Sequence, residues 1–241
     1  MTYVMIGVFG LLGAFYLFAF LTALFERQYL VGDVEPTSQP YPHTPLPYWN
    51  ATAQDAMRLG FIRGGEFATK KNTSLVKGLE SLWITPDRQV IASIVCGTFA
   101  KVPLKKTTLT TRLADGRVLV SVDNPLQPDP SGVTDRAVLL NAGIAELLNF
   151  HRQRIVQSGC PAVPFANASL LAETERIELE RGAQLVHLGL ARWGEPQKVS
   201  IRGTFKGAVK QMIDGYAKMP RKLRAQRDRA DIRRAGSVLP T

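Results

Sequence analysis

Residues 105–123 read KKTTLTTRLADGRVLVSVD and carry the strongest short-range strand signal of the chain. Apolar and polar residues alternate in two arms that flank an Ala-Asp-Gly turn at residues 114–116. Successive side chains of a β-strand point to opposite faces, so a period of two predicts strands. An Asp-Gly turn between two such arms indicates a β-hairpin. We therefore expect an antiparallel hairpin at this position.

Further strands are predicted ahead of this hairpin. Residues 79–85 and 89–98 are rich in apolar and β-branched side chains. The intervening Pro-Asp-Arg at residues 86–88 favours a tight turn. Residues 60–69 can add a fifth strand. The sequence therefore predicts an antiparallel β-meander over about residues 60–123.

Helices are expected to cover this meander. Apolar residues recur at steps of three and four from Val133 to Ile155, which predicts the main helix at about 132–157. A second helix is expected at about 167–181. Helices that lay their apolar sides on an antiparallel sheet define an α+β fold, which we assign to a domain at residues 50–204.

Residues 184–204 allow two interpretations. Apolar residues alternate over 186–190, as in a strand, but the same residues can end the preceding helix. A Gly-Glu-Pro turn at residues 194–196 favours a hairpin at about 185–203. The hairpin is the expectation, and a continued helix is the alternative.

The amino-terminal segment, residues 1–25, predicts a transmembrane anchor. Residues 2–25 carry no charged side chain, and a helix of that length rises roughly 36 Å, enough to cross a hydrocarbon core of about 30 Å. No positive charge precedes the apolar run and no small-residue cleavage site follows it, which favours a retained helix over a cleaved signal peptide. Small residues on this helix can admit a partner helix, and these are Gly7, Gly10, Gly13 and Ala14.

A Pro-rich spacer is expected after the anchor, at residues 26–49. Its prolines remove backbone donors and fix φ, so neither a helix nor a central strand is predicted there. A short helix that is capped by Asn50 or Thr52 and ends at Leu59 should follow. Basic residues beyond the spacer have no counterpart ahead of the anchor, so the positive-inside bias predicts a cytoplasmic domain on the cell (inner) membrane.

The carboxyl-terminal region, residues 205–241, is predicted to be an amphipathic helix followed by a basic tail. Most of the chain's net charge of +10 lies in this region. Anionic lipid or an acidic protein partner is the expected contact of the tail, because aromatic stacking residues for nucleic acid are scarce in it. The candidate binding residues are Arg221, Lys222, Arg224, Arg227, Arg229, Arg233 and Arg234.

The sequence offers no recognisable catalytic, cofactor or metal motif, so none of these sites is predicted. Two cysteines make neither a disulfide framework nor a zinc site. His151 falls on the apolar stripe of the main helix, where a packed, hydrogen-bonded side chain is the expectation. Asp123, Asp129 and Asp135 are interpreted as a turn residue, a loop residue and a helix first-turn acid rather than as cation ligands.

The combined expectation is a single-pass membrane-anchored binding or scaffolding module. An enzyme with an unrecognised active site is the less favoured alternative. A second alternative is a tethered nucleic-acid binder that uses residues 184–234, through neutralisation of phosphates by its basic side chains.

Overall fold

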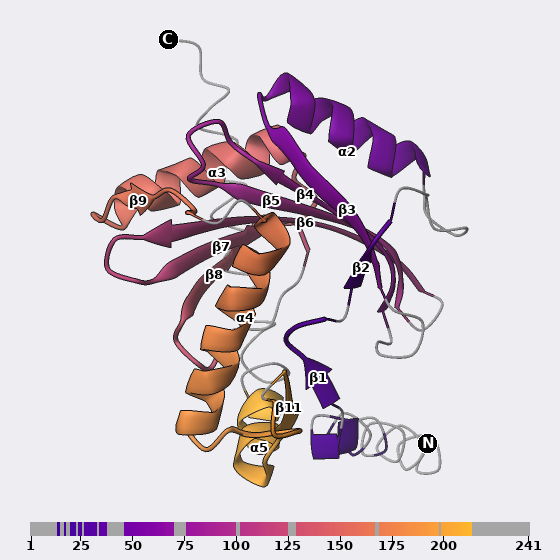
Figure 1. The fold of residues 1–241 in the computed structure, drawn as a ribbon, viewed down its shortest axis with the longest axis vertical. Coiled ribbons are helices and arrows are strands. Elements are labelled where there is room, and N and C mark those ends of the chain that lie inside the picture. The colour runs from indigo at the N-terminus through magenta and orange to yellow at the C-terminus, as the bar shows by residue number, and fades with distance from the viewer. Residues whose placement is uncertain are drawn as a thin grey trace, which may run out of the picture.

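The structure is a computed structural model of the 241-residue chain. It describes residues 14, 17, 20–22, 24–25, 27–32, 34–37, 46–69, 76–99, 102–124, 129–166, 169–197 and 199–213. A large twisted sheet lies at the centre, and a small second sheet lies near the amino-terminal segment (Figure 1).

The large sheet has eight strands and contains the predicted meander. Its strands, in the order in which they pair, are β2 (Val34–Pro36), β3 (Ile62–Thr69), β4 (Val76–Ile84), β5 (Ile91–Phe99), β6 (Val102–Leu113), β7 (Val118–Val122) and β8 (Thr134–Val138), while β9 (Ala162–Val163) pairs with β6. Strands β3 to β7 are antiparallel neighbours. The α+β fold and the antiparallel meander are therefore confirmed.

Residues 105–123 form the β6–β7 hairpin with the alternation that the sequence predicts. Leu109 belongs to the apolar cluster on one face of the sheet, and Thr111 on the same face bonds to His151. Arg112 points to the other face and pairs with Glu180 at 2.8 Å. A period of two thus places each side chain on its observed face.

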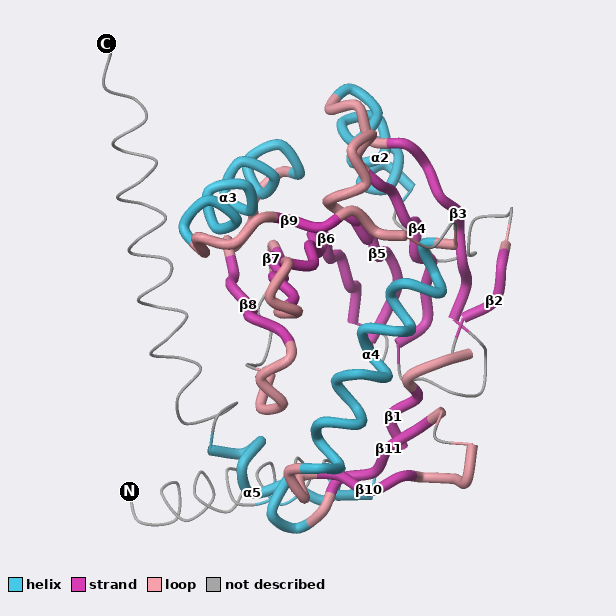
Figure 2. Tube along the Cα trace, turned by 60° about the vertical axis from the view of Figure 1, so that its left-hand side comes forward, coloured by secondary structure: helices cyan, strands magenta, loops and turns pink. Residues whose placement is uncertain are grey.

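Helices cover both faces of the large sheet (Figure 2). Helices α2 (Leu46–Arg58) and α3 (Ile144–Gln157) enclose one cluster, in which Trp49, Leu109 and Leu147 are buried. Helix α4 (Leu170–His187) encloses the second cluster, which contains Ile84, Val118 and Ile177. The sheet is buried between two helical layers.

The small sheet has three antiparallel strands in the order β1 (Arg27–Tyr29), β11 (Ser200–Gly203) and β10 (Ala191–Trp193). Ile201 packs with Leu30 and Leu185, which joins this sheet to the carboxyl-terminal half of α4. Helix α5 (Phe205–Met212) follows β11 directly, and Thr204 caps it by accepting a hydrogen bond from the Gly207 amide.

The predicted main helix at 132–157 is wrong in its first part. Residues 134–138 form β8, which pairs in parallel with β7, and α3 begins only at Ile144. Apolar spacing alone could not reveal that the edge of β7 offers backbone hydrogen bonds to this segment. Asn141 then adopts a left-handed conformation, with φ of 56°, and separates the strand from the helix.

Two other boundaries differ from the predictions. The helix expected at 167–181 runs as α4 to His187, because its last turns pack on the small sheet. The hairpin expected at 185–203 begins later, at Ala191, so the apolar residues ahead of it belong to the helix end and a turn.

The segment expected to be an extended spacer, residues 26–49, contains regular structure. Strands β1 and β2 pair with β11 and β3, and α2 begins at Leu46 rather than at the predicted cap residues. Pro47 lies in the first turn of α2, where a missing amide donor costs nothing. Tyr48 and Trp49 pack against the sheet and thereby favour this earlier start.

The predicted anchor falls mainly outside the described residues, as does the basic tail beyond residue 213. Within the described part of the chain, no helix combines the length and the apolar character that a bilayer crossing requires. The described residues of the amino-terminal segment between Ala14 and Phe25 have helical backbone.

Candidate functional site

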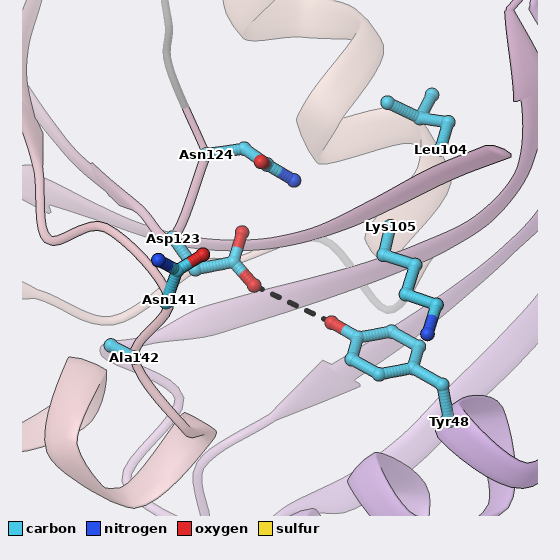
Figure 3. Close-up of a pocket in the computed structure, with 7 residues that line it drawn as sticks. All are labelled: Tyr48, Leu104, Lys105, Asp123, Asn124, Asn141 and Ala142. Atoms are coloured by element: carbon cyan, nitrogen blue, oxygen red, sulfur yellow. Dashed lines mark hydrogen bonds between the residues drawn. The ribbon is translucent and has the colours of Figure 1, made fainter. Parts of the chain in front are cut away.

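A polar pocket lies between α2, the ends of β6 and β7, and the turn that precedes α3 (Figure 3). Its cavity volume is about 380 Å³. The residues that line it are Tyr48, Leu104, Lys105, Asp123, Asn124, Asn141 and Ala142. Four separate segments of the chain therefore meet at this site.

Asp123 is the buried acid of the pocket, with 8% of its surface exposed. It follows β7 directly, and its Oδ1 accepts a hydrogen bond from the Thr107 amide at 2.8 Å. Its Oδ2 accepts one from the Tyr48 hydroxyl at 3.4 Å. Burial is the largest influence on this carboxyl and raises its pKa, because a charged carboxylate loses hydration in the interior.

Tyr48 reaches Asp123 from the first turn of α2. Its hydroxyl also lies 3.0 Å from Thr107 Oγ1, and either oxygen can donate that hydrogen bond. Burial raises the pKa of Tyr48, and the nearby Asp123 charge adds to the rise. The phenol therefore stays protonated and serves as a donor at neutral pH.

Lys105 supplies a positive charge on the opposite side of the pocket from Asp123 (Figure 3). Its Nζ lies 5.0 Å from the centroid of the Tyr48 ring, which is within the range of a cation–π interaction. Lys105 and Thr107 are two residues apart on β6, so strand geometry places both side chains on the face that carries the pocket.

Asn141 lines the pocket from the turn that precedes α3. Its φ of 56° is a conformation that asparagine tolerates better than most residues. In this conformation its amide donates to the Asp123 carbonyl at 3.0 Å. The backbone of the α3 approach is thereby tied to the end of β7.

His151 belongs to α3 and lies outside the pocket, on the side of the helix that faces the sheet. Its Nδ1 is 2.8 Å from Ser121 Oγ, and its Nε2 is 2.9 Å from Thr111 Oγ1. Burial lowers the pKa of His151 to about 3, with a further contribution from the Arg154 charge. The side chain is packed and hydrogen-bonded, as the sequence predicts, and its lowered pKa keeps it neutral.

A second group of charged side chains lies on the α4 side of the sheet. Glu80 accepts a hydrogen bond from Ser93 Oγ at 2.5 Å, and burial raises the pKa of its carboxyl. Burial lowers the pKa of Lys106 in the same region. Arg181, at the edge of this layer, pairs with Glu178 at 2.7 Å. The Glu80 contact lies within the sheet and the Arg181 contact lies within α4, and these residues line no described pocket.

The structure brings together none of the sequence-predicted site residues in this pocket. Gly7, Gly10, Gly13 and the tail residues from Arg221 to Arg234 lie outside the described residues, while Ala14 is described and exposed. Among the described residues, no three His, Cys, Asp or Glu side chains are grouped as metal ligands.

The pocket residues gave little signal in the sequence. The sequence pattern makes Asp123 a turn residue and places Tyr48 in the spacer. Only the position of Asp123 directly after an alternating strand could have marked it, because side chains at strand ends often line sites.

The geometry defines an α+β protein with a polar pocket at one end of its sheet. No protein-family model, curated protein or solved structure matches the chain. The side chains of the pocket are therefore the basis for the function proposed below.

Proposed function

We propose that this chain is a membrane-anchored binding module whose folded part binds a small polar ligand beside Asp123. The pocket is the observation that carries this proposal, because it combines a buried carboxyl, a lysine and two asparagines in one cavity. Convergent polar groups in a concave site are typical of ligand recognition. The charge-free residues 2–25 support attachment to the membrane.

The chemistry of the walls defines the class of ligand. Asp123 accepts hydrogen bonds and favours a hydroxyl or an amine on the ligand. Lys105 favours a carboxylate, a phosphate or a carbonyl on the opposite end. A compact molecule with a donor at one end and an acceptor or anion at the other, such as an amino acid or a sugar acid, fits this arrangement.

The basic tail gives the module a second contact. On an anionic membrane surface, each Lys or Arg contributes about 1 kcal/mol of attraction. The seven basic residues between Arg221 and Arg234 would hold the tail on anionic lipid or on an acidic protein partner. A pull-down in mild detergent, with and without residues 221–241, shows whether the tail holds an acidic protein partner or only anionic lipid.

A ligand panel tests the pocket. Full-length protein in detergent is titrated with amino acids and sugar acids, and saturation-transfer NMR reports binding. Asp123→Asn should weaken the best ligand by at least about tenfold, because a charge-assisted hydrogen bond is worth roughly 1.5–3 kcal/mol. Asp55→Asn, an exposed change on α2, is the matched control. Equal binding by both variants would contradict the proposal.

An enzyme is the second candidate, favoured by one observation. Tyr48 and Asp123 share a cavity and both have a raised pKa, a combination that is common at catalytic sites. If a ligand of the panel is converted by the wild type and bound but unchanged by Asp123→Asn, the site is catalytic. Nucleic-acid binding through residues 184–234 is tested by its salt dependence, which must be steep.

A further inference from the structure

A row of three arginines crosses the small sheet. In the register of its strands, Arg202 on β11 lies directly opposite Arg27 on β1 and Arg192 on β10. Directly opposed residues point to the same face, with Cβ atoms about 4.5–5.5 Å apart, and like charges in such positions repel. An anion beside the row would relieve this repulsion.

The described residues balance only part of the positive charge of the row. Glu195 pairs with Arg27 at 3.6 Å and is the one described carboxylate that forms an ion pair with the row. Arg202 Nε, Ser200 Oγ and Glu195 Oε1 are buried without a hydrogen-bond partner. Ser200 and Arg202 are two residues apart on β11 and therefore share a face. This face holds unsatisfied donors as well as excess positive charge.

The arginine face is the side of the small sheet that points away from α4. Ile201 lies between Ser200 and Arg202 and points the other way, into the cluster with Leu185 and Leu190. On the arginine face, Arg192 is exposed, and 32% of the Arg27 side chain is accessible. An external ligand can therefore reach the row.

Apolar side chains surround the same end of the molecule. The Phe20 ring lies 5.6 Å from the Phe205 ring, so the amino-terminal segment contacts the start of α5. Several large apolar side chains are exposed along these two helical segments, namely Leu17, Leu21, Phe25, Phe205, Val209 and Ile213. Arg27 follows Phe25 by only two residues. Exposed apolar surface next to cations is the pattern of a helix at a membrane interface.

We propose that the row Arg27–Arg202–Arg192 binds the phosphate of an anionic phospholipid, while α5 lies in the interfacial layer of the bilayer. The inference rests on the membrane attachment in the proposed function. Guanidinium groups match phosphate oxygens in a bidentate geometry, and the exposed Arg192 and the partly exposed Arg27 present theirs at the surface. Free phosphate would leave the neighbouring apolar side chains unexplained.

Native mass spectrometry of the full-length chain in detergent tests this site. Phosphatidylglycerol and phosphatidylcholine with identical acyl chains are the probes. Phosphatidylglycerol should be retained at least about tenfold more strongly. The double change Arg192→Gln and Arg202→Gln should remove most of this preference, whereas Arg152→Gln on the exposed side of α3 should leave it unchanged.

Further variants separate the possible causes of a loss. Arg192→Lys with Arg202→Lys keeps the charge but not the bidentate geometry, and should retain only part of the preference. A tail variant with Arg224, Arg227 and Arg229 changed to Gln removes part of the tail's own attraction to anionic lipid. The further loss caused by the Arg192→Gln and Arg202→Gln double change should be the same in this background as in the wild type. Melting temperature shows that the variants fold, because removal of opposed like charges should not lower it.

Three results would overturn the inference. These are equal retention of the two lipids, an unaltered preference in the Gln double variant, and displacement of phosphatidylglycerol by millimolar inorganic phosphate. An alkaline carbonate wash of membranes tests the anchor separately. If the chain stays in the membrane while the lipid preference is absent, the arginine site fails and the proposed anchoring stands.

Discussion

A few buried hydrogen bonds hold the polar residues of the pocket in place. Asp123 is held by the Thr107 amide and the Tyr48 hydroxyl, and Asn141 fixes its backbone. The burial that positions this carboxyl also opposes its ionisation. Functional residues often carry such a cost in stability, since the same environment that shapes a site disfavours a charge.

Asp123→Asn is expected to raise the free energy of unfolding at pH 7. The pKa of Asp123 is raised in the folded state, so its favourable contribution is present below the ordinary value of 3.8 and is lost as the pH rises through the folded value. The neutral amide avoids that loss. Urea unfolding at pH 7 measures the gain, with Asp55→Asn as the control. A less stable variant at pH 7 would be inconsistent with this account.

His151 should make the fold sensitive to acid. Its pKa falls from 6.5 to about 3 on folding, so its contribution is fully present above pH 6.5 and is lost as the pH falls towards the folded value. The unfolded chain takes up one proton at His151 in this range, which lowers the free energy of unfolding by about 2 kcal/mol between pH 6.5 and pH 5.

His151→Gln tests this linkage. The variant keeps a side chain that can reach Ser121 and Thr111, and it removes the titration. The difference in unfolding free energy between pH 6.5 and pH 5 should therefore shrink by about 2 kcal/mol relative to the wild type. If urea titrations give the two proteins the same pH slope, His151 is not the linked group.

At the scale of elements, close backbone packing places α5. Helix α5 meets the turn after α4 at Gly207, where an added Cβ would overlap the carbonyl oxygen of Leu190. Lys206 Nζ and Thr204 Oγ1 donate to carbonyls of the same turn, those of Leu188 and Gly189. The position of α5, and with it the apolar side that we assign to the membrane, depends on this contact.

Gly207→Ala should detach α5 from the turn after α4. Overpacking of a close contact costs about 1–3 kcal/mol, so the helix moves before the rest of the domain unfolds. Hydrogen exchange should show faster exchange in residues 205–212 and little change in α3. Gly143→Ala, at a position with open space around it, is the control. Unchanged protection of α5 in the Gly207 variant would rule out the contact.

At the scale of the whole molecule, the two cysteines make topology measurable. Cys96 is buried, and burial raises the pKa of its thiol to about 12, so it reacts slowly. Cys160 is partly exposed in the turn after α3. A membrane-impermeant maleimide therefore reports on Cys160.

Labelling should require opening of the membrane. If the domain is cytoplasmic, as the positive-inside bias predicts, intact cells or right-side-out vesicles should give little signal and permeabilised ones full signal. Cys160→Ser should abolish the signal, while Cys96→Ser should leave it nearly unchanged. Complete labelling of intact cells would reverse the proposed orientation.

The sequence predicts local structure correctly where one hydrophobic period is present without a competing one. The alternation around the Asp-Gly turn predicted the β6–β7 hairpin, and four further strand or turn signals outlined the meander. It misassigned residues 134–138 because a strand that completes a sheet edge is defined by its neighbour rather than by its own spacing. It also missed the strands and the helix start in residues 26–49, where pairing with distant segments outweighs proline content.

Three features can be read from the sequence, because each depends on residues that are close together in the chain: the charge-free amino-terminal segment, the basic carboxyl-terminal region and the hairpin. The pocket and the arginine row become visible only in the folded chain. Tyr48, Lys105 and Asp123 come from three distant segments, and Arg27 meets Arg202 only through the pairing of β1 with β11. Such sites arise from long-range packing and register, which no local pattern encodes.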